Sequence, residues 1–271
     1  MSTEYLHRED APFSHGIWEQ IDRAAIHAAK NQLCARRMLD IEGPYGLGLK
    51  FLPGPDRVVQ PSGADGVELA VSEAVPLLQI RHSFALPARD IATFEQSGQP
   101  IDLCAVSAAA VTCAKLEDEL VFYGSQDLGI RGLLTSEEIQ HHKFTDWTKA
   151  GAAANDVIEA VTLLDKAGFH GPYALGLAPA LHNQLYRHYP GTRGTELEHL
   201  KQIIGGAIVK APGIQAGGIL LATGAHYATI ALGQDFQAGF TGPAGAFYEF
   251  FLCETIALRL RQPKSVCALI F

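Results

Sequence analysis

Histidine and carboxylate pairs are the residues best suited to hold a metal ion in this sequence. His141 and His142 are adjacent, so on a helix or a strand their side chains would point in different directions. We therefore expect a polar loop here and not a pair of ligands. Glu196 and His199 have the Glu-x-x-His spacing of di-iron helical bundles, but that signature needs a second copy and two further Glu-bearing helices. Because the sequence supplies neither, residues 196–201 are predicted to form a solvated first helical turn, and no metal site is expected.

Acid/base and nucleophile motifs give no coherent catalytic set. Glu117, Asp118 and Glu119 are consecutive and should fan over different faces of a helix, so we interpret them as a solvated or subunit-facing side. The sequence lacks Gly-x-Ser-x-Gly, His-Glu-x-x-His and a P-loop lysine. The close glycines of residues 43–48 follow a predicted helix and precede an extended segment, which is the wrong context for a dinucleotide fold. We therefore expect no catalytic residues and no cofactor.

The balance of charges bears on the class of partner. The chain has 271 residues, with 21 Lys and Arg against 29 Asp and Glu, which gives a net charge of −8. This argues against nucleic acid as a partner, because phosphate contacts need a dense basic patch. Charged residues make up 18% of the chain, against about 25% in ordinary soluble proteins, and apolar residues make up 48%. We infer that neighbouring subunits cover much of the surface.

The cysteines and the N-terminal residues indicate in which cellular compartment the protein is expected. The five cysteines are odd in number and lack Cys-x-x-Cys spacing, which is typical of reduced thiols in a cytoplasmic protein. The first ten residues contain acids and lack the apolar core of a signal peptide. The longest uncharged stretch, 211–234, contains Pro212 and several glycines, which favours short strands over a membrane helix. We expect a cytoplasmic protein without membrane contact.

Periodic patterns predict the elements that position these residues. Apolar residues at three- and four-residue spacing predict helices over 14–38, 102–123 and 155–167. Shorter helices are expected over 179–187 and just before Gly205, on either side of a glycine-rich loop. Residues 45–76 are rich in Gly and Pro and have little core of their own, so they are predicted to form an extended arm that lies on its own domain or on another subunit. Strands are predicted over 78–84, 173–177, 208–209, 218–222, 226–232, 247–260 and 266–271.

Several short motifs, in order along the chain, resemble one protein family. They are Asp40-Ile-Glu-Gly-Pro-Tyr-Gly46, Pro76-Leu-Leu-Gln-Ile-Arg81, Glu117-Asp-Glu-Leu-Val-Phe-Tyr-Gly124, Gly132-Leu-Leu134, Gly171-Pro-Tyr173, Leu232-Gly-Gln-Asp235 and Glu254-Thr255. Over about residues 10–271 the chain resembles the encapsulins, shell proteins related to the major capsid proteins of tailed phages. The resemblance covers nearly the whole chain.

The resemblance implies a fold and its domains. We expect an α+β, tailed-phage major-capsid-like fold with a peripheral domain, an extended loop and an axial domain. By this resemblance, the peripheral domain comprises residues 1–44, 77–135 and 224–260, the extended loop 45–76, and the axial domain 136–223 and 261–271. A Pro- and Gly-bearing loop in the axial domain is expected to line a five-fold opening; its residues are His188, Tyr189, Pro190, Gly191, Thr192, Arg193 and Gly194.

The resemblance also implies a function. Encapsulins are not themselves enzymes; they form icosahedral shells, here expected to have sixty subunits, around a cargo enzyme that carries a C-terminal targeting peptide. The expected cargo is a dye-decolourising peroxidase, with a ferritin-like iron oxidase as second choice. Some members bind a flavin against a tryptophan near the strand after the arm, but Trp18 and Trp147 are the only tryptophans here and neither supports a flavin. A prophage capsid protein and a linocin-like, bacteriocin-type antibacterial protein are the alternatives.

Carried over by position, the family's cargo-docking site maps to six residues. They are Ala29, Leu33, Arg36, Asp40, Asp235 and Phe236. The first four have four-three-four spacing, so on one continuous helix they share a face. The alternative is that Ala29 and Leu33 simply pack against the shell, and Ala29 is a methyl where some relatives have a bulky aromatic. Arg36 is expected to face the lumen and hold a peptide carbonyl or carboxylate, so that Arg36→Glu would reduce cargo and spare assembly.

Overall fold

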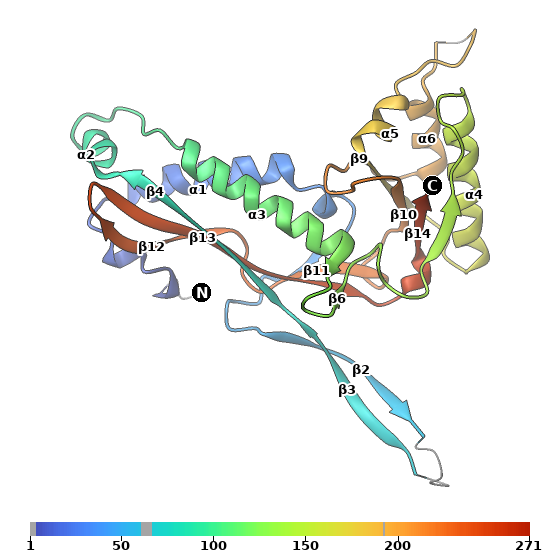
Figure 1. Cartoon of the computed structure of the whole chain (residues 1–271), viewed down its shortest axis with the longest axis horizontal. Helices are drawn as coiled ribbons and strands as arrows, with labels where there is room; N and C mark the ends of the chain where they lie inside the picture. The colour runs from blue at the N-terminus through green and yellow to red at the C-terminus, as the bar shows by residue number, and fades with distance from the viewer. Residues whose placement is uncertain (1–3, 61–66, 192) are drawn as a thin grey trace.

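The computed structural model describes residues 4–60, 67–191 and 193–271 (Figure 1). The chain forms two parts at opposite ends of an elongated molecule, each built on a five-stranded sheet. A two-stranded arm projects from the side of the molecule (Figure 1). Among the described helices, none is both long enough and apolar enough to cross a lipid bilayer.

The first sheet is organised around one long strand, β13 (Phe247–Leu260). It pairs antiparallel with β4 (Leu78–Pro87), β11 (Ala228–Leu232) and β12 (Gln237–Ala244). β1 (Asp40–Glu42) extends the sheet by pairing with β11 in parallel. All residues from position 250 to 257 of β13 are buried, so both faces of the strand are covered in its middle section.

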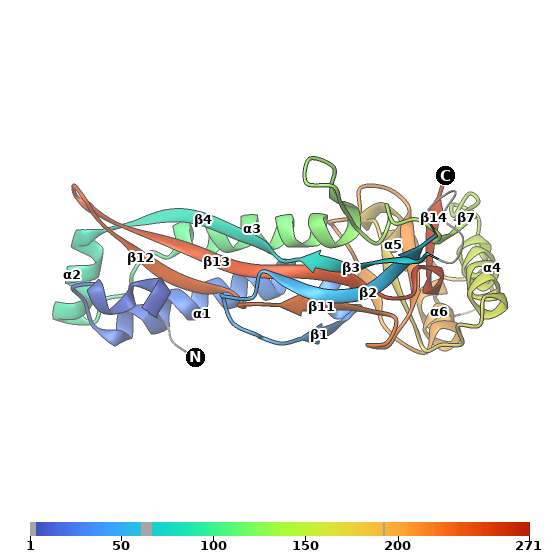
Figure 2. The same ribbon diagram turned by 90° about the horizontal axis from the view of Figure 1, so that it is seen from below.

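Two long helices pack beside this sheet. α1 (His15–Gln32) and α3 (Cys104–Tyr123) lie against each other, and both contact strands of the first sheet (Figure 2). α2 (Ala88–Ser97) follows β4 at the far end. The core between these layers includes Phe84 and Phe250, whose rings stack at 5.3 Å between centroids. Aromatic burial of this kind supplies much of the packing energy of such a core.

The second sheet has the strand order β7-β14-β10-β8-β9. Its members are β7 (Gln140–Lys143), β14 (Val266–Ile270), β10 (Gly218–Ala222), β8 (Tyr173–Leu177) and β9 (Ile208–Lys210). The three inner strands pair antiparallel, and the two edge strands join them in parallel. The three inner strands are almost wholly buried, as is expected of a sheet covered on both faces.

Three helices belong to this second part. α4 (Ala152–Lys166) and α6 (Glu196–Ile204) contribute to its own hydrophobic core, and α5 (Pro179–Gln184) leads into the loop before α6. α6 begins at a capping box, in which the Thr195 side chain accepts from the N–H of Glu198 and the Glu198 carboxylate accepts from the N–H of Thr195. This reciprocal pair fixes where the loop ends and the helix begins.

The arm is a hairpin of β2 (Phe51–Val59) and β3 (Leu69–Pro76). Nearly all described side chains of β3 are exposed, and the apolar Leu69 and Val71 are among them. A second, much shorter hairpin, β5 (Gly124–Ser125) with β6 (Ile130–Arg131), follows α3. An isolated two-stranded ribbon is marginally stable in water, so the arm has little internal support for its exposed apolar residues.

The first helix is shorter than its sequence pattern predicts. The spacing predicts helix to residue 38, but α1 ends at Gln32 and a short 3-10 turn follows at Ala35–Arg37. The reason is a side chain from another helix: the Asp118 carboxylate accepts the backbone N–H groups of Cys34 and Ala35. These N–H groups would otherwise bond to the preceding turn of the helix.

Other elements also differ from the predictions, and the short strands β1, β5 and β6 are among them. The segment holding His141 and His142 is the edge strand β7 and not a loop. α2 and β12 were not predicted, whereas the arm, α3, α4 and β13 lie close to their predicted positions. β12 carries glycines and a register shift between Phe240 and Gly242, which weakens any alternating pattern in its sequence.

Candidate functional site

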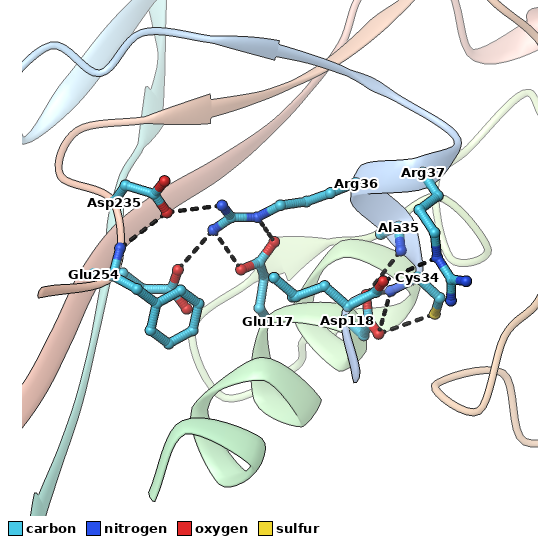
Figure 3. A network of polar contacts seen from close by, with 10 residues as sticks. Cys34, Ala35, Arg36, Arg37, Glu117, Asp118, Asp235 and Glu254 are labelled. Carbon is cyan, nitrogen blue, oxygen red and sulfur yellow. Dashed lines mark hydrogen bonds and ion pairs between the residues drawn. The ribbon is translucent and has the colours of Figure 1, made fainter. Parts of the chain in front are cut away.

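One arginine lies at the centre of a buried group of charges. Arg36 donates to both oxygens of Glu117, each at 2.7 Å, to Glu254 Oε2 at 2.9 Å and to Asp235 Oδ1 at 2.7 Å (Figure 3). Glu117 and Glu254 are completely buried, and the Arg36 side chain is 16% exposed. We call Arg36, Glu117, Asp235 and Glu254 the Arg36 cluster.

Each member of the cluster comes from a different element. Arg36 stands in the 3-10 turn after α1, Glu117 on α3, Glu254 on β13, and Asp235 between β11 and β12. Asp118, next to Glu117 on α3, fixes the 3-10 turn by its bonds to Cys34 and Ala35. Two neighbouring acids of α3 therefore act on Arg36: Asp118 fixes the turn that carries it, and Glu117 pairs with its guanidinium group (Figure 3).

The environment of the cluster shifts the pKa of its two buried glutamates. Burial, and then repulsion from Glu117, raises the pKa of Glu254 well above its ordinary value. Burial also raises the pKa of Glu117, although its bonds to Arg36 oppose that effect. Oε1 of Glu254 has no hydrogen-bond partner among the described residues, and an unpartnered buried oxygen is far less costly on a neutral carboxyl group than on a carboxylate. Burial and the unpartnered oxygen therefore both favour the protonated form of Glu254.

The interpretation of the acidic run on α3 is wrong for two of its three residues. Glu117 and Asp118 are fully buried and hold the structure together, while Glu119 is exposed as expected. Burial also raises the pKa of Asp118, opposed by the hydrogen bonds from Cys34 and Ala35. The sequence carries one signal that could have revealed this: Glu254 is the single charge in a run of apolar residues on β13, and a buried charge needs a partner.

A cavity of about 340 Å³ adjoins the cluster at Asp235. Its lining comes from the N-terminal segment, the segment after β1 and the loop that carries Asp235. The lining residues are Tyr5, Pro44, Tyr45, Gly46, Leu47, Gly48, Gly233, Gln234, Asp235 and Gln237. We call it the Asp235 cavity. Among the described residues that line it, Asp235 is the one charged side chain.

The loop predicted to line a five-fold opening lies at the tip of the second part (Figure 1). His188 pairs with Thr195 in a β-bridge, and the Tyr189 N–H donates to the Gly194 carbonyl at 3.1 Å, so the loop closes as a narrow hairpin. Pro190, Gly191 and Arg193 are exposed, and Thr192 lies outside the described residues. Its place relative to a symmetry axis stays a prediction.

The remaining candidates for chemistry have structural roles. His142 Nε2 lies 3.2 Å from Asp156 Oδ1, and the same carboxylate accepts from the Trp147 Nε1–H at 2.7 Å. Glu196 is 1% exposed and accepts the N–H of Gly151, so the prediction of a solvated turn is wrong at this residue. In the part of the chain that the structure describes, no three His, Cys, Asp or Glu residues gather as metal ligands would.

Comparison with known proteins connects this geometry to a family. The family model described as "Encapsulating protein for peroxidase" matches residues 3–257. The chain is 31% identical over 278 aligned positions to the type 1 encapsulin shell protein of Myxococcus xanthus, with 98% of this chain and 96% of that protein covered. This chain belongs to the encapsulin shell-protein family.

Solved structures confirm the fold. The virus-like particle of Pyrococcus furiosus superimposes with a TM-score of 0.73 at 22% identity, covering 93% of this chain and 99% of that one. The capsid protein of the Myoviridae phage XM1 superimposes with a TM-score of 0.62 at 10% identity, covering 87% of this chain and 90% of that one. The predicted α+β, tailed-phage-capsid fold is therefore confirmed.

The structure separates the six residues expected to dock cargo in this encapsulin-family chain. Ala29 and Leu33 are 2% and 5% exposed and belong to the hydrophobic core. Residues 29, 33, 36 and 40 do not share a helix face, because α1 ends before Leu33 and Asp40 begins β1. Asp40 and Asp235 are exposed, and Phe236 is half-buried with its ring 5.6 Å from the Arg36 guanidinium.

Arg36 is not free to hold a peptide carbonyl or carboxylate, since three acidic side chains already surround it, and whether it faces the lumen stays a prediction. Arg36→Glu would place four carboxyl groups together and leave buried acids without a counter-charge. We expect the subunit to lose on the order of 3–5 kcal/mol of stability, and with it the yield of folded protein. The measurement is the denaturant midpoint of the purified protein. Arg23→Glu, on the exposed face of α1, is the matched control; equal midpoints for the two variants would contradict this role of Arg36.

The raised pKa of Glu254 predicts that the stability of the folded protein depends on pH. A carboxyl group whose pKa is raised by folding favours the native state at low pH, and that contribution is lost as pH rises through the native pKa. Glu254→Gln cannot ionise, so the thermal midpoint of the variant should gain on that of the wild type as pH rises from the ordinary Glu value of 4.5 through the higher pKa of the native state. Taking the difference between the two proteins cancels other groups that titrate in this range. Parallel curves for the two proteins would show that Glu254 does not titrate there.

Proposed function

We propose that this chain is the self-assembling shell subunit of an encapsulin nanocompartment, with no catalytic activity of its own. The observation that carries this proposal is the arm of β2 and β3, which exposes apolar residues and has no core beneath it. Such a surface is stabilised when a second copy of the chain covers it. Membership of the encapsulin family and the low charge content of the sequence support the same conclusion.

We assign the parts of the subunit to positions in a sixty-subunit icosahedral shell. The first sheet with α1 and α3 serves as the peripheral domain, and the second part serves as the axial domain. The loop from His188 to Gly194 then lines the five-fold opening. Repeated heterologous contacts of this kind close into a shell when they recur around the symmetry axes.

The arm contributes one face to this assembly. Val59 pairs with Leu69 and Arg57 pairs with Val71 across the two strands, so these four side chains share a face. Leu69, Val71 and Val59 are 59%, 49% and 46% exposed, so they form the apolar part of that face. Because no core lies beneath them, polar substitutions there should spare the fold of the subunit.

The double substitution Leu69→Asp and Val71→Asp should therefore block assembly. We expect wild-type particles of sixty times the 29.1 kDa subunit mass, and folded monomers or small oligomers from the variant. Light scattering coupled to size exclusion measures the mass, and circular dichroism checks the fold. Leu128→Asp, at the exposed turn between β5 and β6, is the control and should assemble. Wild-type protein that stays monomeric at micromolar concentration would refute the shell.

We propose further that the shell encloses a cargo enzyme through its C-terminal targeting peptide. The expected cargo is a dye-decolourising peroxidase, with a ferritin-like protein as second choice. Asp40, Asp235 and Phe236 form the accessible part of the docking surface, Arg36 holds Asp235 in place, and Ala29 and Leu33 support the site from the core. The five free cysteines are in keeping with packaging in the reducing cytoplasm.

Deleting the C-terminal tail of the protein encoded beside the shell gene should abolish its recovery with the shell. A disordered tail gains order on binding, so its contacts supply the affinity that retains the cargo. The measurement is cargo per shell after co-expression and purification. An equal-length deletion at the cargo N-terminus is the control. Undiminished loading after the tail deletion would show that cargo is held in another way.

A further inference from the structure

We infer that the Asp235 cavity accepts a basic side chain, lysine or arginine, from the peptide that docks in the shell. The inference rests on the proposed docking function and adds the chemical class of one recognised residue. The cavity measures about 340 Å³, which is enough for the end of a long side chain and its first hydration shell. It lies directly beside the exposed docking residue Asp235.

The charge of the cavity favours a cation. Oδ1 of Asp235 accepts from Arg36 Nη1 and from the Phe236 N–H, while Oδ2 has no hydrogen bond to any described residue. The Asp235 side chain is 53% exposed, so the free oxygen is accessible from solvent. No Lys, Arg or His is among the residues that line the cavity. Arg36 itself is occupied by three acidic side chains, and the charges of Glu117 and Asp235 alone exceed its own, so the cluster as a whole has no positive charge to offer a ligand.

The other walls suit the same ligand. Tyr5 and Tyr45 line the cavity and are 66% and 52% exposed, and aromatic rings attract ammonium and guanidinium groups. Gln234 donates through Nε2 to Cys253 Sγ at 3.2 Å, which leaves its carbonyl oxygen to accept from a ligand. Carboxylate, amide oxygen and two phenol rings together provide acceptors and π faces, which a basic side chain matches and an acidic one does not.

The wall formed by Tyr5 is anchored and not a loose terminus. Its neighbour Leu6 is 2% exposed and packs in one cluster with Phe251 and Cys253 of β13. Arg8 then pairs with both oxygens of Asp22 on α1, at 2.8 and 2.6 Å, and donates to the Ala238 carbonyl. These contacts hold the N-terminal segment across the sheet, so the cavity exists before a ligand arrives and little ordering is needed on binding.

The test uses a fluorescent reporter protein with three alternative ten-residue tails. The first tail contains only glycine and serine. The second has lysine at three of its positions, and the third has glutamate at the same three positions. Each reporter is co-expressed with the shell, and the reporter recovered per shell is measured. We expect several-fold more of the lysine-tailed reporter than of either other reporter in wild-type shells.

Matched shell variants distinguish binding of the lysine tail in this cavity from its general electrostatic attraction to an acidic shell. Asp235→Asn keeps the oxygen that accepts from Arg36 and removes the charge, and Tyr5→Ala removes one aromatic wall. Both should abolish the advantage of the lysine tail, while Asp127→Asn, an exposed acid in the turn between β5 and β6, should leave it intact. Equal loading of the three reporters in wild-type shells, or a lysine advantage that persists in Asp235→Asn, would overturn the inference. Either result leaves the shell proposal standing, because particle mass and retention of the native cargo are measured separately.

Discussion

One guanidinium group joins four segments that lie far apart in the chain. Arg36 connects the turn after α1 to α3, to β13 and to the loop before β12. Transfer of a positive charge out of water costs desolvation free energy. The two bonds from Arg36 to Glu117 offset that cost because their bidentate geometry is close to ideal. The position of Asp235 and the contact of the turn after α1 with α3 and β13 depend on this interaction. The cluster therefore sets the geometry of the surface on which docking is proposed.

The cluster also explains why the burial of Glu117 and Asp118 was not predicted from the sequence. Apolar spacing predicts long periodic elements such as α3 and β13. The capsid-like fold was predicted from motifs along the whole chain. Local patterns assign acids to solvent, since most acids are exposed. Glu117 and Asp118 are exceptions because residues more than 80 positions away supply their partners. No local pattern contains that information, so the end of α1 and the role of Arg36 could not be predicted.

The proposed docking surface shows the same limit. Spacing placed Ala29, Leu33, Arg36 and Asp40 on one helical face, and that argument fails once a carboxylate from α3 ends the helix early. Asp235 and Phe236 were placed by family resemblance; Asp235 is the exposed member of the cluster, and Phe236 lies half-buried beside it. The Asp235 cavity was outside any prediction, because its walls come from the N-terminal segment, the segment after β1 and the loop after β11. Such a site exists only once the sheet has formed.

The strand order has a consequence for synthesis on the ribosome. β13 is the central strand of the first sheet, and β14 lies between β7 and β10 in the second, yet both are among the last elements of the chain. Neither sheet is complete before its late strand, β13 or β14, has been translated. Both sheets therefore depend on pairings between segments that are distant in the sequence, and such pairings fold slowly. A nascent subunit that has not yet reached β13 and β14 thus lacks finished contact surfaces for its neighbours.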